Sequence, residues 1–224
     1  MHEHRLRVDR TARYYVLGSA GPQVRRLWFV LHGYGQLAAS LLRRCESLAS
    51  VDTIVVAPEA LSRFYLAPVS AADHKTAKVG ATWMTKEARA SEIADYVAYL
   101  DRLHAEIVHQ CGGGTIETRV LGFSQGVATA VRWALLGQTA PSSHLLLWAG
   151  GLPQEIWTDS ARARLAETEL VLAAGDADPY VPSQELAGTV EKAQAFGYRV
   201  RAFGFAGGHA ITSETLAQAI ASQR

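Results

Sequence analysis

Short apolar runs alternate with longer amphipathic segments along this chain, and this alternation constrains the fold more than any other feature of the sequence. Near-continuous apolar runs of about five residues are typical of strands that are buried on both faces, as in a parallel sheet. The last of these runs, Tyr198–Phe205, alternates between apolar and polar residues more than the others do, so we expect it nearer an edge of the sheet. The predicted strands are Leu27–Leu31, Thr53–Ala57, Arg119–Phe123, His144–Trp148, Leu170–Ala174 and Tyr198–Phe205.

Apolar residues recur at helical spacing in the segments between these strands. Strands and helices alternate in the manner of βαβ units, which favours the α/β class with a mostly parallel central sheet and helices on both of its faces. The opening stretch, His2–Leu17, is expected to add an antiparallel hairpin at one edge. We expect a single domain over residues 1–224. The predicted helices are Leu37–Ala49, Lys86–Val108, Gly126–Leu136, Pro182–Phe196 and Ser213–Ser222.

One segment, Pro58–Met84, interrupts this pattern because it contains no clear strand. It carries the large side chains of Phe64, Tyr65, Trp83 and Met84. A stretch of this length without regular structure is often functional, so residues 58–84 are a candidate lid or pocket-lining excursion. An ordinary surface loop is the alternative, and the sequence does not separate the two.

Composition excludes several classes of protein. Hydrophobic residues make up 49% of the 224 residues and charged residues 19%, whereas a disordered chain combines low hydrophobicity with high net charge. The net charge of +1 provides no overall field for a polyanion, so nucleic acid is not expected as a partner. Two cysteines build no disulfide framework, and no apolar run is long enough for a bilayer span. Because no signal peptide is recognised either, we expect a cytoplasmic protein without stable membrane insertion.

The sequence Gly122-Phe123-Ser124-Gln125-Gly126 has the G-x-S-x-G pattern of a nucleophile elbow. It closes a predicted strand and opens a predicted helix, which is the setting that such an elbow needs. The nucleophile in this tight turn has a strained backbone, and glycines at 122 and 126 remove collisions with their neighbours. Ser124 is therefore the candidate nucleophile. The alternative is a strand end with an exposed serine.

A serine hydroxyl needs a base, and His209 is the best candidate. It follows Gly207 and Gly208 just after the last predicted strand, which places it on a loop at the carboxyl edge of the sheet. His144 begins a strand and therefore lies at the opposite edge. His32 is expected to hydrogen-bond within its own loop and to fix its shape. The remaining histidines are interpreted as solvated surface residues: His2, His4, His104 and His109.

An acid is then needed to orient the imidazole, and Asp176 and Asp178 both follow the predicted strand Leu170–Ala174. Both are placed at the carboxyl edge, and the chain order Ser, Asp, His is that of the α/β hydrolases. Pro179 restricts the backbone of Asp178, and this rigidity suits an orienting residue. Asp176 is better placed to hydrogen-bond the backbone of the turn. We therefore expect Asp178 to be the acid, although the triad order alone leaves both open.

The loop at residues 31–35 is the candidate oxyanion loop, because it follows a predicted strand and contains Gly33 and Gly35. Its glycines allow backbone N–H groups to turn toward a bound carbonyl. One donor is expected from this loop and a second from the backbone N–H of Gln125, the residue after the nucleophile. No cluster of Cys and His has metal-ligand spacing, so neither a metal nor another cofactor is expected.

These motifs together resemble the phospholipase/carboxylesterase group of α/β hydrolases, which includes the acyl-protein thioesterases. The resemblance covers the chain from Leu27 to about Ala219, and Leu152-Pro153 is similar to the strand-end turn of that family. The motifs are HGYG at 32–35, GFSQG at 122–126, GDADPYVP at 175–182 and GGH at 207–209.

The resemblance implies an α/β-hydrolase fold with Ser124, Asp178 and His209 as the catalytic residues. It also implies that the backbone N–H groups of Tyr34 and Gln125 are the oxyanion donors. Two residues depart from the family pattern, since Tyr34 stands where an aliphatic residue is common and residue 127 is a valine where many members have a small residue. Both departures bear on substrate preference and leave the implied catalytic roles intact.

The sequence therefore predicts a serine carboxylesterase that hydrolyses small-molecule esters of small to medium acyl chains without a cofactor. Within enzymes, the alternatives are an acyl-thioesterase, a lysophospholipase or a peptidase on the same triad. Outside enzymes, the alternative is a non-catalytic scaffold that binds a small ligand. The oligomeric state is not determined, and a homodimer stays open. The candidate substrate-binding residues are Phe64, Tyr65, Trp83 and Leu152.

Overall fold

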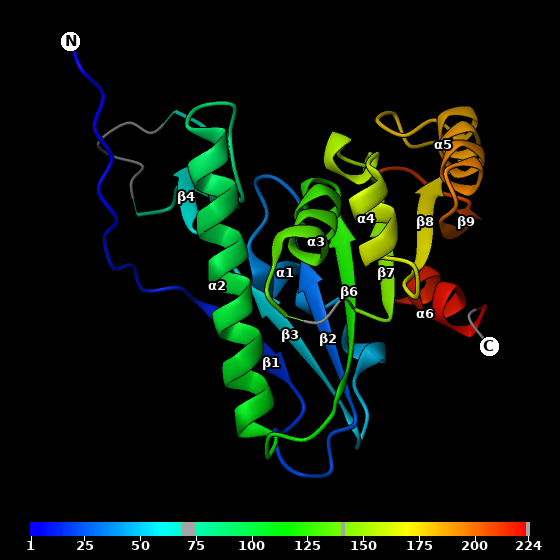
Figure 1. The fold of residues 1–224 in the computed structure, drawn as a ribbon, viewed down its shortest axis with the longest axis horizontal. Coiled ribbons are helices and arrows are strands. Elements are labelled where there is room, and N and C mark those ends of the chain that lie inside the picture. The colour runs from blue at the N-terminus through cyan, green and yellow to red at the C-terminus, as the bar shows by residue number, and fades with distance from the viewer. Residues whose placement is uncertain (69–74, 140–141, 223–224) are drawn as a thin grey trace.

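A seven-stranded sheet in the order β1-β3-β2-β6-β7-β8-β9 forms the centre of the computed structural model (Figure 1). The structure describes residues 1–68, 75–139 and 142–222. β1 is antiparallel to β3, and every other neighbouring pair in this sheet is parallel, which confirms the α/β class. The strands are β1 (Tyr14–Leu17), β2 (Arg26–Leu31), β3 (Thr53–Pro58), β6 (Glu117–Phe123), β7 (His144–Trp148), β8 (Glu169–Gly175) and β9 (Arg199–Phe205).

Burial explains why the apolar runs form these strands. All of β3 is buried, and so is β2 apart from Arg26, whereas β9 alternates between intermediate and exposed residues at the edge of the sheet. The parallel register pairs Leu31 with Gly122 and Phe123 with Trp148, so the carboxyl ends of β2, β6 and β7 meet at one edge. The candidate nucleophile follows β6 at this edge.

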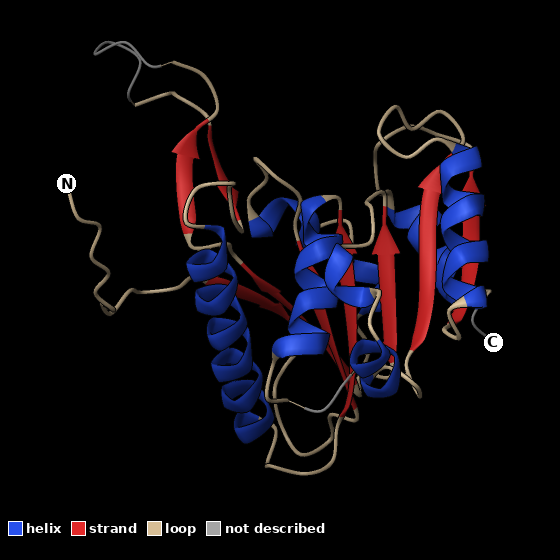
Figure 2. Ribbon diagram, turned by 45° about the horizontal axis from the view of Figure 1, so that its top comes forward, coloured by secondary structure: helices blue, strands red, loops and turns tan. Residues whose placement is uncertain are grey.

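Helices cover both faces of the sheet (Figure 2). Successive side chains of a strand point to opposite faces, so Phe29 belongs to the core that contains residues of α2, α3 and α5, and Trp28 belongs to the core that contains residues of α1 and α6. Among the residues that the structure describes, none of the helices combines the length and apolar character needed to span a membrane. The helices are α1 (Ala38–Leu42), α2 (Arg89–Gln110), α3 (Gln125–Leu136), α4 (Asp159–Arg164), α5 (Ser183–Ala195) and α6 (Ser213–Ala221).

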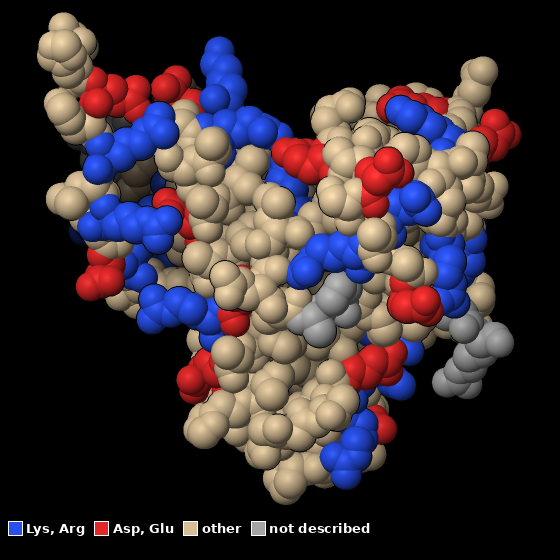
Figure 3. Space-filling model, in the orientation of Figure 1, with Lys and Arg blue, Asp and Glu red and all other residues tan. Residues whose placement is uncertain are grey.

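The surface carries charged side chains of both signs. On the face shown in Figure 3, Lys and Arg side chains are interspersed with Asp and Glu side chains. This distribution accompanies a net charge of +1 over the chain.

The N-terminal stretch differs from the prediction. The expected hairpin over His2–Leu17 is wrong, because only β1 pairs with the sheet and residues 2–13 contain no strand. Those residues are mostly charged or polar and nearly all exposed, so they have no apolar face to bury against a neighbour. β1 instead runs antiparallel along β3, with Tyr14 opposite Pro58.

The predicted helix over Leu37–Ala49 is also shorter than expected. It is divided into α1 and a 3₁₀ turn at Glu46–Leu48. Leu42, Cys45 and Leu48 are all buried. This spacing of three residues matches the three residues per turn of a 3₁₀ helix better than it matches an α-helix.

The segment Pro58–Met84 contains two strands where the sequence predicted no clear strand, so that prediction is wrong. β4 (Ser62–Tyr65) and β5 (Val79–Thr82) form an antiparallel two-stranded sheet, here called the β4–β5 hairpin. Each strand has four residues and neither has a clear apolar alternation, which explains why no pattern marked them. Residues 69–74 of this segment lie outside the described residues.

His104 on α2 is half-buried, so its interpretation as a solvated surface residue is wrong. Its ring contacts the rings of Phe29 and Trp133, and its Nε2 lies 2.9 Å from Thr118 Oγ1. His104 follows the buried Leu100 by four residues and therefore lies on the same face of the helix. His109 on the same helix is exposed, as expected.

His144 begins β7 at the amino edge of the sheet, away from the candidate nucleophile, as the sequence predicted. Its Nε2 lies 3.2 Å from a carboxylate oxygen of Glu169, and the Nε of Arg201 donates to the other oxygen at 2.8 Å. On the adjoining strand, Glu117 accepts hydrogen bonds from Arg26 and other neighbours. Ionic side chains thus join neighbouring strands at the edge opposite the candidate site.

The free energy of unfolding is expected to fall as the pH drops below about 6.5, the ordinary pKa of histidine. Burial lowers the pKa of His104 and of His144 in the folded protein, so the unfolded chain takes up protons at a higher pH than the folded chain does. Urea unfolding at about pH 7.5 and about pH 5.5 should therefore give the lower free energy of unfolding at the acidic pH.

The double variant His104→Asn/His144→Asn should show a smaller difference between the two pH values than the wild type. His109→Asn is the matched control, because this exposed histidine lies on the same helix as His104. It should keep the wild-type difference. An unchanged pH dependence in the double variant would contradict the role given to burial.

Candidate active site

Ser124 lies in the sharp turn between β6 and α3, with φ 54° and ψ −114°. A positive φ is strained for a residue with a side chain, and the surrounding packing holds it in place. A Cβ on Gly122 would collide with the carbonyl oxygen of Gly126, and a Cβ on Gly126 would collide with the carbonyl oxygen of Leu31. The G-x-S-x-G pattern is therefore a steric requirement of this turn.

A chain of hydrogen bonds links Ser124, His209 and Asp178. The Nε2 of His209 lies 3.1 Å from the Oγ of Ser124, and its Nδ1 lies 2.9 Å from Oδ2 of Asp178. An ionised carboxylate only accepts hydrogen bonds, so Nδ1–H donates to Asp178. Nε2 is then the acceptor for the serine O–H. This is the arrangement of a nucleophile, a base and an orienting acid.

The two aspartates of the loop after β8 have different partners. The side chain of Asp178 is fully buried, and its Oδ1 accepts hydrogen bonds from the backbone N–H groups of Tyr180 at 2.8 Å and Val181 at 3.2 Å. The Oδ1 of Asp176 accepts from the backbone N–H of Gly207 at 2.9 Å. The structure thus places Asp178 against the imidazole and Asp176 in the backbone of the adjoining loop.

The loop that carries His209 is held by its neighbours on several sides. The indole N–H of Trp148 donates to the carbonyl oxygen of Ala210 at 2.9 Å. The rings of Phe123 and Tyr180 contact the imidazole, with centroid separations of 5.2 Å and 4.7 Å. These contacts limit rotation of the ring and keep Nε2 directed at Ser124.

Two backbone N–H groups beside Ser124 are available to a bound oxygen. In the candidate oxyanion loop, Gly33 N–H donates to Oε1 of Gln36 and Gly35 N–H donates to the carbonyl oxygen of Ala81. The N–H of Tyr34, between them, donates to no acceptor among the described residues, and neither does that of Gln125. Both Tyr34 and Gln125 line the cleft that contains Ser124.

His32 is not placed to act as a base. It is fully buried, its Nδ1–H donates to the carbonyl oxygen of Gly33 at 2.8 Å, and its Nε2 accepts from the backbone N–H of Ala60 at 3.1 Å. Burial lowers the pKa of His32, so the ring is neutral near pH 7. The prediction that it hydrogen-bonds within its own loop is confirmed.

The cleft above Ser124 has a volume of about 570 Å³. Small residues form much of its lining, and the exposed rings of Tyr34 and Tyr180 belong to it as well. Sequence reasoning missed Tyr180, although it lies within the motif that contains Asp178. The lining residues are Tyr34, Ser124, Gln125, Ala128, Ala149, Gly150, Gly151, Tyr180, Val181 and His209.

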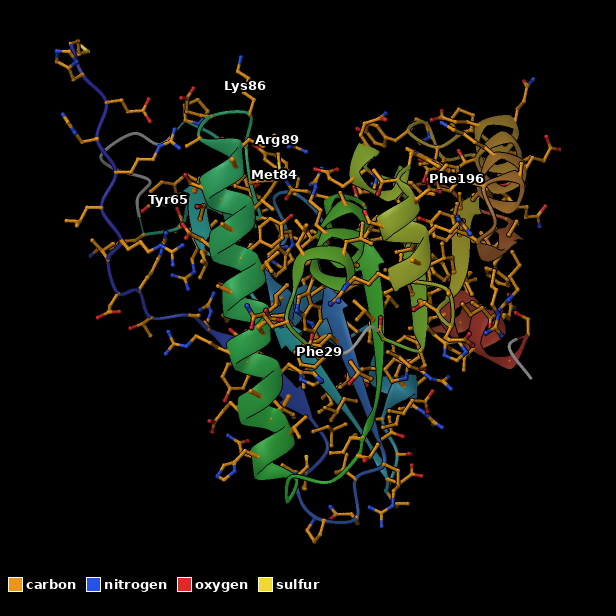
Figure 4. All side chains as sticks on the ribbon, in the orientation of Figure 1. Phe29, Tyr65, Met84, Lys86, Arg89 and Phe196 are labelled. Carbon is orange, nitrogen blue, oxygen red and sulfur yellow. The ribbon has the colours of Figure 1, made fainter. Side chains whose placement is uncertain are left out.

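None of the four candidate substrate-binding residues lines this cleft. Phe64 lies next to it, because its ring contacts Tyr34 at a centroid separation of 5.1 Å. Tyr65 is half-exposed on β4 (Figure 4), and Leu152 packs against the core. Trp83 is only 3% exposed, and its indole N–H donates to the carbonyl oxygen of His32 at 2.8 Å. Trp83 is therefore placed behind the candidate oxyanion loop.

No group of three or more His, Cys, Asp or Glu side chains within the described ranges is arranged to hold a metal ion. Both cysteines are buried and free, and burial raises the pKa of Cys45 to about 12. Neither thiol lies in the cleft. The hydroxyl of Ser124, the candidate nucleophile, does lie in the cleft.

The sequence of this chain is similar to that of a known protein family. The model of the phospholipase/carboxylesterase family matches residues 17–223. This chain belongs to the phospholipase/carboxylesterase family. The match includes the elbow, the loops of Asp178 and His209, and the candidate oxyanion loop, so the family resemblance of the motifs is confirmed. No curated protein matches the chain in sequence.

Solved structures of similar fold include members named as esterases and as a thioesterase. Esterase PE8 is 24% identical, covering 95% of this chain and 98% of that chain, with a TM-score of 0.70. A carboxylesterase from Mesorhizobium loti is 20% identical, with 94% of each chain covered and a TM-score of 0.68. Zea mays acyl-protein thioesterase 2 is 19% identical, covering 95% of this chain and 98% of that chain, with a TM-score of 0.67. At these identities the likeness establishes the α/β-hydrolase fold.

Replacing Trp83 with alanine is expected to lower stability and not to alter a preference for acyl length. The indole packs on His32 and Tyr96, and truncation of a buried tryptophan costs about 3–5 kcal/mol. Urea unfolding should report this loss, and any hydrolysis that remains should fall by the same factor for every acyl length. Leu152→Ala, which truncates another candidate substrate-binding residue that packs against the core, is the comparison variant. A changed acyl-length profile in Trp83→Ala alone would show that the indole contacts substrate.

Proposed function

We propose that this protein is a serine carboxylesterase that hydrolyses small-molecule esters of small to medium acyl chains. The observation that carries the proposal is the chain of hydrogen bonds from Ser124 through His209 to Asp178. It lies beside two backbone N–H groups, those of Tyr34 and Gln125, that have no acceptor among the described residues. Membership of the phospholipase/carboxylesterase family supports the same reaction class.

The reaction follows from the positions of these groups. Ser124 Oγ attacks the ester carbonyl while Nε2 of His209 takes its proton, and the carboxylate of Asp178 stabilises the resulting imidazolium. The carbonyl oxygen becomes an oxyanion, which accepts hydrogen bonds from the N–H groups of Tyr34 and Gln125. The alcohol leaves after Nε2–H returns the proton to it. Water then hydrolyses the acyl-enzyme by the same steps and releases the acid.

The size of the cleft supports a small to medium acyl group. Its volume of about 570 Å³ lies within the range of roughly 300–1,000 Å³ typical of small-molecule sites. Ala128, Gly150 and Gly151 leave room beside Ser124, and Tyr34 and Tyr180 offer apolar ring surface. These surfaces suit an uncharged ester better than a strongly charged one.

A thioester is the second candidate substrate. One structural relative is named as an acyl-protein thioesterase, and the same triad and oxyanion donors can act on a thioester. Hydrolysis of p-nitrophenyl esters of graded acyl length, measured beside an acyl-thioester, separates the two. We expect the oxygen esters to give the higher kcat/KM. A lysophospholipid and a peptide amide test the remaining alternatives on this triad.

Ser124→Ala should lower kcat on an activated ester by roughly a million-fold while the free energy of unfolding stays near that of the wild type, because triad members act as a unit. The measurement is hydrolysis of a p-nitrophenyl ester together with labelling by a fluorophosphonate, which the variant should not undergo. Ser160→Ala, at an exposed serine on α4, is the matched control and should behave as the wild type. Failure of the wild-type protein to be labelled would favour the non-catalytic scaffold.

Replacement of each aspartate separates the two roles in the loop after β8. Asp178→Asn should lower kcat near neutral pH by roughly four orders of magnitude, because the imidazole loses the acceptor that sets its tautomer. Asp176→Asn should change kcat far less and should act mainly on stability, since among the described residues its carboxylate accepts a hydrogen bond only from the backbone N–H of Gly207. The reverse order of the two rates would identify Asp176 as the acid.

A further inference from the structure

The candidate oxyanion loop is paired with β5 as if it were a third strand of the β4–β5 hairpin. The N–H of Gly35 donates to the carbonyl oxygen of Ala81 at 2.9 Å, and the N–H of Ala81 donates to the carbonyl oxygen of Gln36 at 3.1 Å. On its other edge, Ala81 is opposite Arg63 of β4. The backbone around Tyr34, which carries one oxyanion donor, is therefore held on one side by β5.

The turn between β6 and α3 that contains Ser124, here called the nucleophile turn, is attached to the end of the same strand. Oε1 of Gln125 accepts from the backbone N–H of Trp83 at 3.0 Å, and its Nε2 donates to the carbonyl oxygen of Met84 at 2.8 Å. Nε2 also lies 2.9 Å from the Oγ1 of Thr82. The backbone N–H of Gln125 is the second oxyanion donor of the proposed reaction. The residue that provides this donor is thus fixed to β5 by its side chain.

Both ends of the hairpin segment also contact His32. The backbone N–H of Ala60, which precedes β4, donates to Nε2 of His32. The indole N–H of Trp83, which follows β5, donates to the carbonyl oxygen of His32. His32 in turn donates to the carbonyl oxygen of Gly33. Two hydrogen bonds from the hairpin segment therefore reach His32, in addition to the pairing of Gly35 and Gln36 with Ala81.

A buried carboxylate anchors the start of the hairpin. The side chain of Glu59 is fully buried and accepts hydrogen bonds from Arg63 on β4 at 2.8 Å and from Arg13 at 2.6 Å. Burial alone would raise the pKa of Glu59, but the hydrogen bonds from Arg63 and Arg13 outweigh it and lower that pKa. Glu59 is therefore charged near pH 7. Its ion pair with Arg63 holds the start of β4 to the end of β3.

We propose that β5 sets the separation of the two oxyanion donors, with Gly80 and the side chain of Gln125 as positioning residues. This inference rests on the proposed function, because it assigns a task to the geometry around the donors. It also makes β4 and β5, the described strands of segment 58–84, a fixed frame for the donors and not a lid. β5 and Trp83, the residue that follows it, form hydrogen bonds with both the candidate oxyanion loop and the nucleophile turn.

Gly80 is the position where this frame tolerates no side chain. A Cβ at residue 80 would lie 2.7 Å from both the Cα and the carbonyl carbon of Gly35, and it would collide with the carbonyl oxygen of Gly35. These are backbone atoms, which cannot rotate away as the end of a side chain can. Because Gly35 follows Tyr34 directly, we expect a methyl group at residue 80 to displace the backbone that carries the donor N–H.

Gly80→Ala is therefore the first test. Loss of one oxyanion donor lowers kcat by about 10²–10³, and we expect a fall of about 100-fold in kcat with little change in KM. Binding of a trifluoromethyl ketone, which forms a tetrahedral adduct with the serine, should weaken by a similar factor. Gly204→Ala is the matched control, because Gly204 also lies in a strand and a Cβ there would meet no atom within 4 Å. It should retain wild-type kcat.

Gln125→Glu is the second test and does not depend on the folding of Gly80→Ala. It keeps the size of the side chain and an acceptor for Trp83 N–H, but it replaces the donor to Met84 with an oxygen that repels that carbonyl. We expect kcat to fall by at least about 10-fold with KM little changed. A purely structural role would instead lower the stability without a selective fall in kcat. Wild-type kcat in Gln125→Glu would overturn the part assigned to this side chain.

A signal from the donor itself separates this inference from the proposed function. In protein labelled with ¹⁵N-tyrosine, the amide resonance of Tyr34, assigned with Tyr34→Phe, should shift in Gly80→Ala and not in Gly204→Ala. If the wild type hydrolyses no ester, the proposed function fails, while a shifted Tyr34 resonance still supports the frame. An unshifted resonance, or a shifted one with wild-type kcat on an ester, overturns the inference.

Discussion

The close approach of the nucleophile turn to the end of β2 is the constraint on which the rest of the site depends. The parallel register places Gly122 beside Leu31, and Gly126 lies so near the carbonyl oxygen of Leu31 that no side chain fits between them. A Cβ on Gly33 would lie 3.1 Å from the Cβ of Ser124. Because these backbones pack directly against each other, Ser124 and the candidate oxyanion loop share one small volume.

The remaining groups reach this volume from separate strand ends. The loops after β8 and β9 bring Asp178 and His209 to the same edge, since parallel strands end together there. β5 approaches from outside the main sheet and is hydrogen-bonded to both Gln36 and Gln125. The site is thus built on the ends of strands, and hydrogen bonds of both backbone and side chains hold its polar groups. Such support favours preorganised donors, which act on developing charge without reorganisation.

Local patterns explain why much of the fold was predictable. Strands such as β7, whose five residues match the predicted range, are marked by continuous burial, and the elbow is marked by its steric need for glycine. The β4–β5 hairpin has no such mark, because its short strands are defined by pairing with each other and with Gln36. The prediction that Trp83 lines a pocket had the same origin, because its segment has no recognisable pattern. Without a pattern, the presence of an aromatic residue does not indicate what its ring packs against.

The sequence by itself determined the class of fold, the family and the positions of Ser124 and His209, because each depends on residues that are close together in the chain. The rigidity that Pro179 gives to its neighbour favoured Asp178 over Asp176, but the triad order left both open. It was the tertiary structure that decided that Asp178 reaches the imidazole while Asp176 reaches a backbone N–H. Both contacts join segments 31 residues apart, and they depend on how two loops meet at the sheet edge. The tertiary structure likewise decided that Trp83 lies behind the oxyanion loop. Contacts between distant segments are set by packing, and no local spacing encodes them.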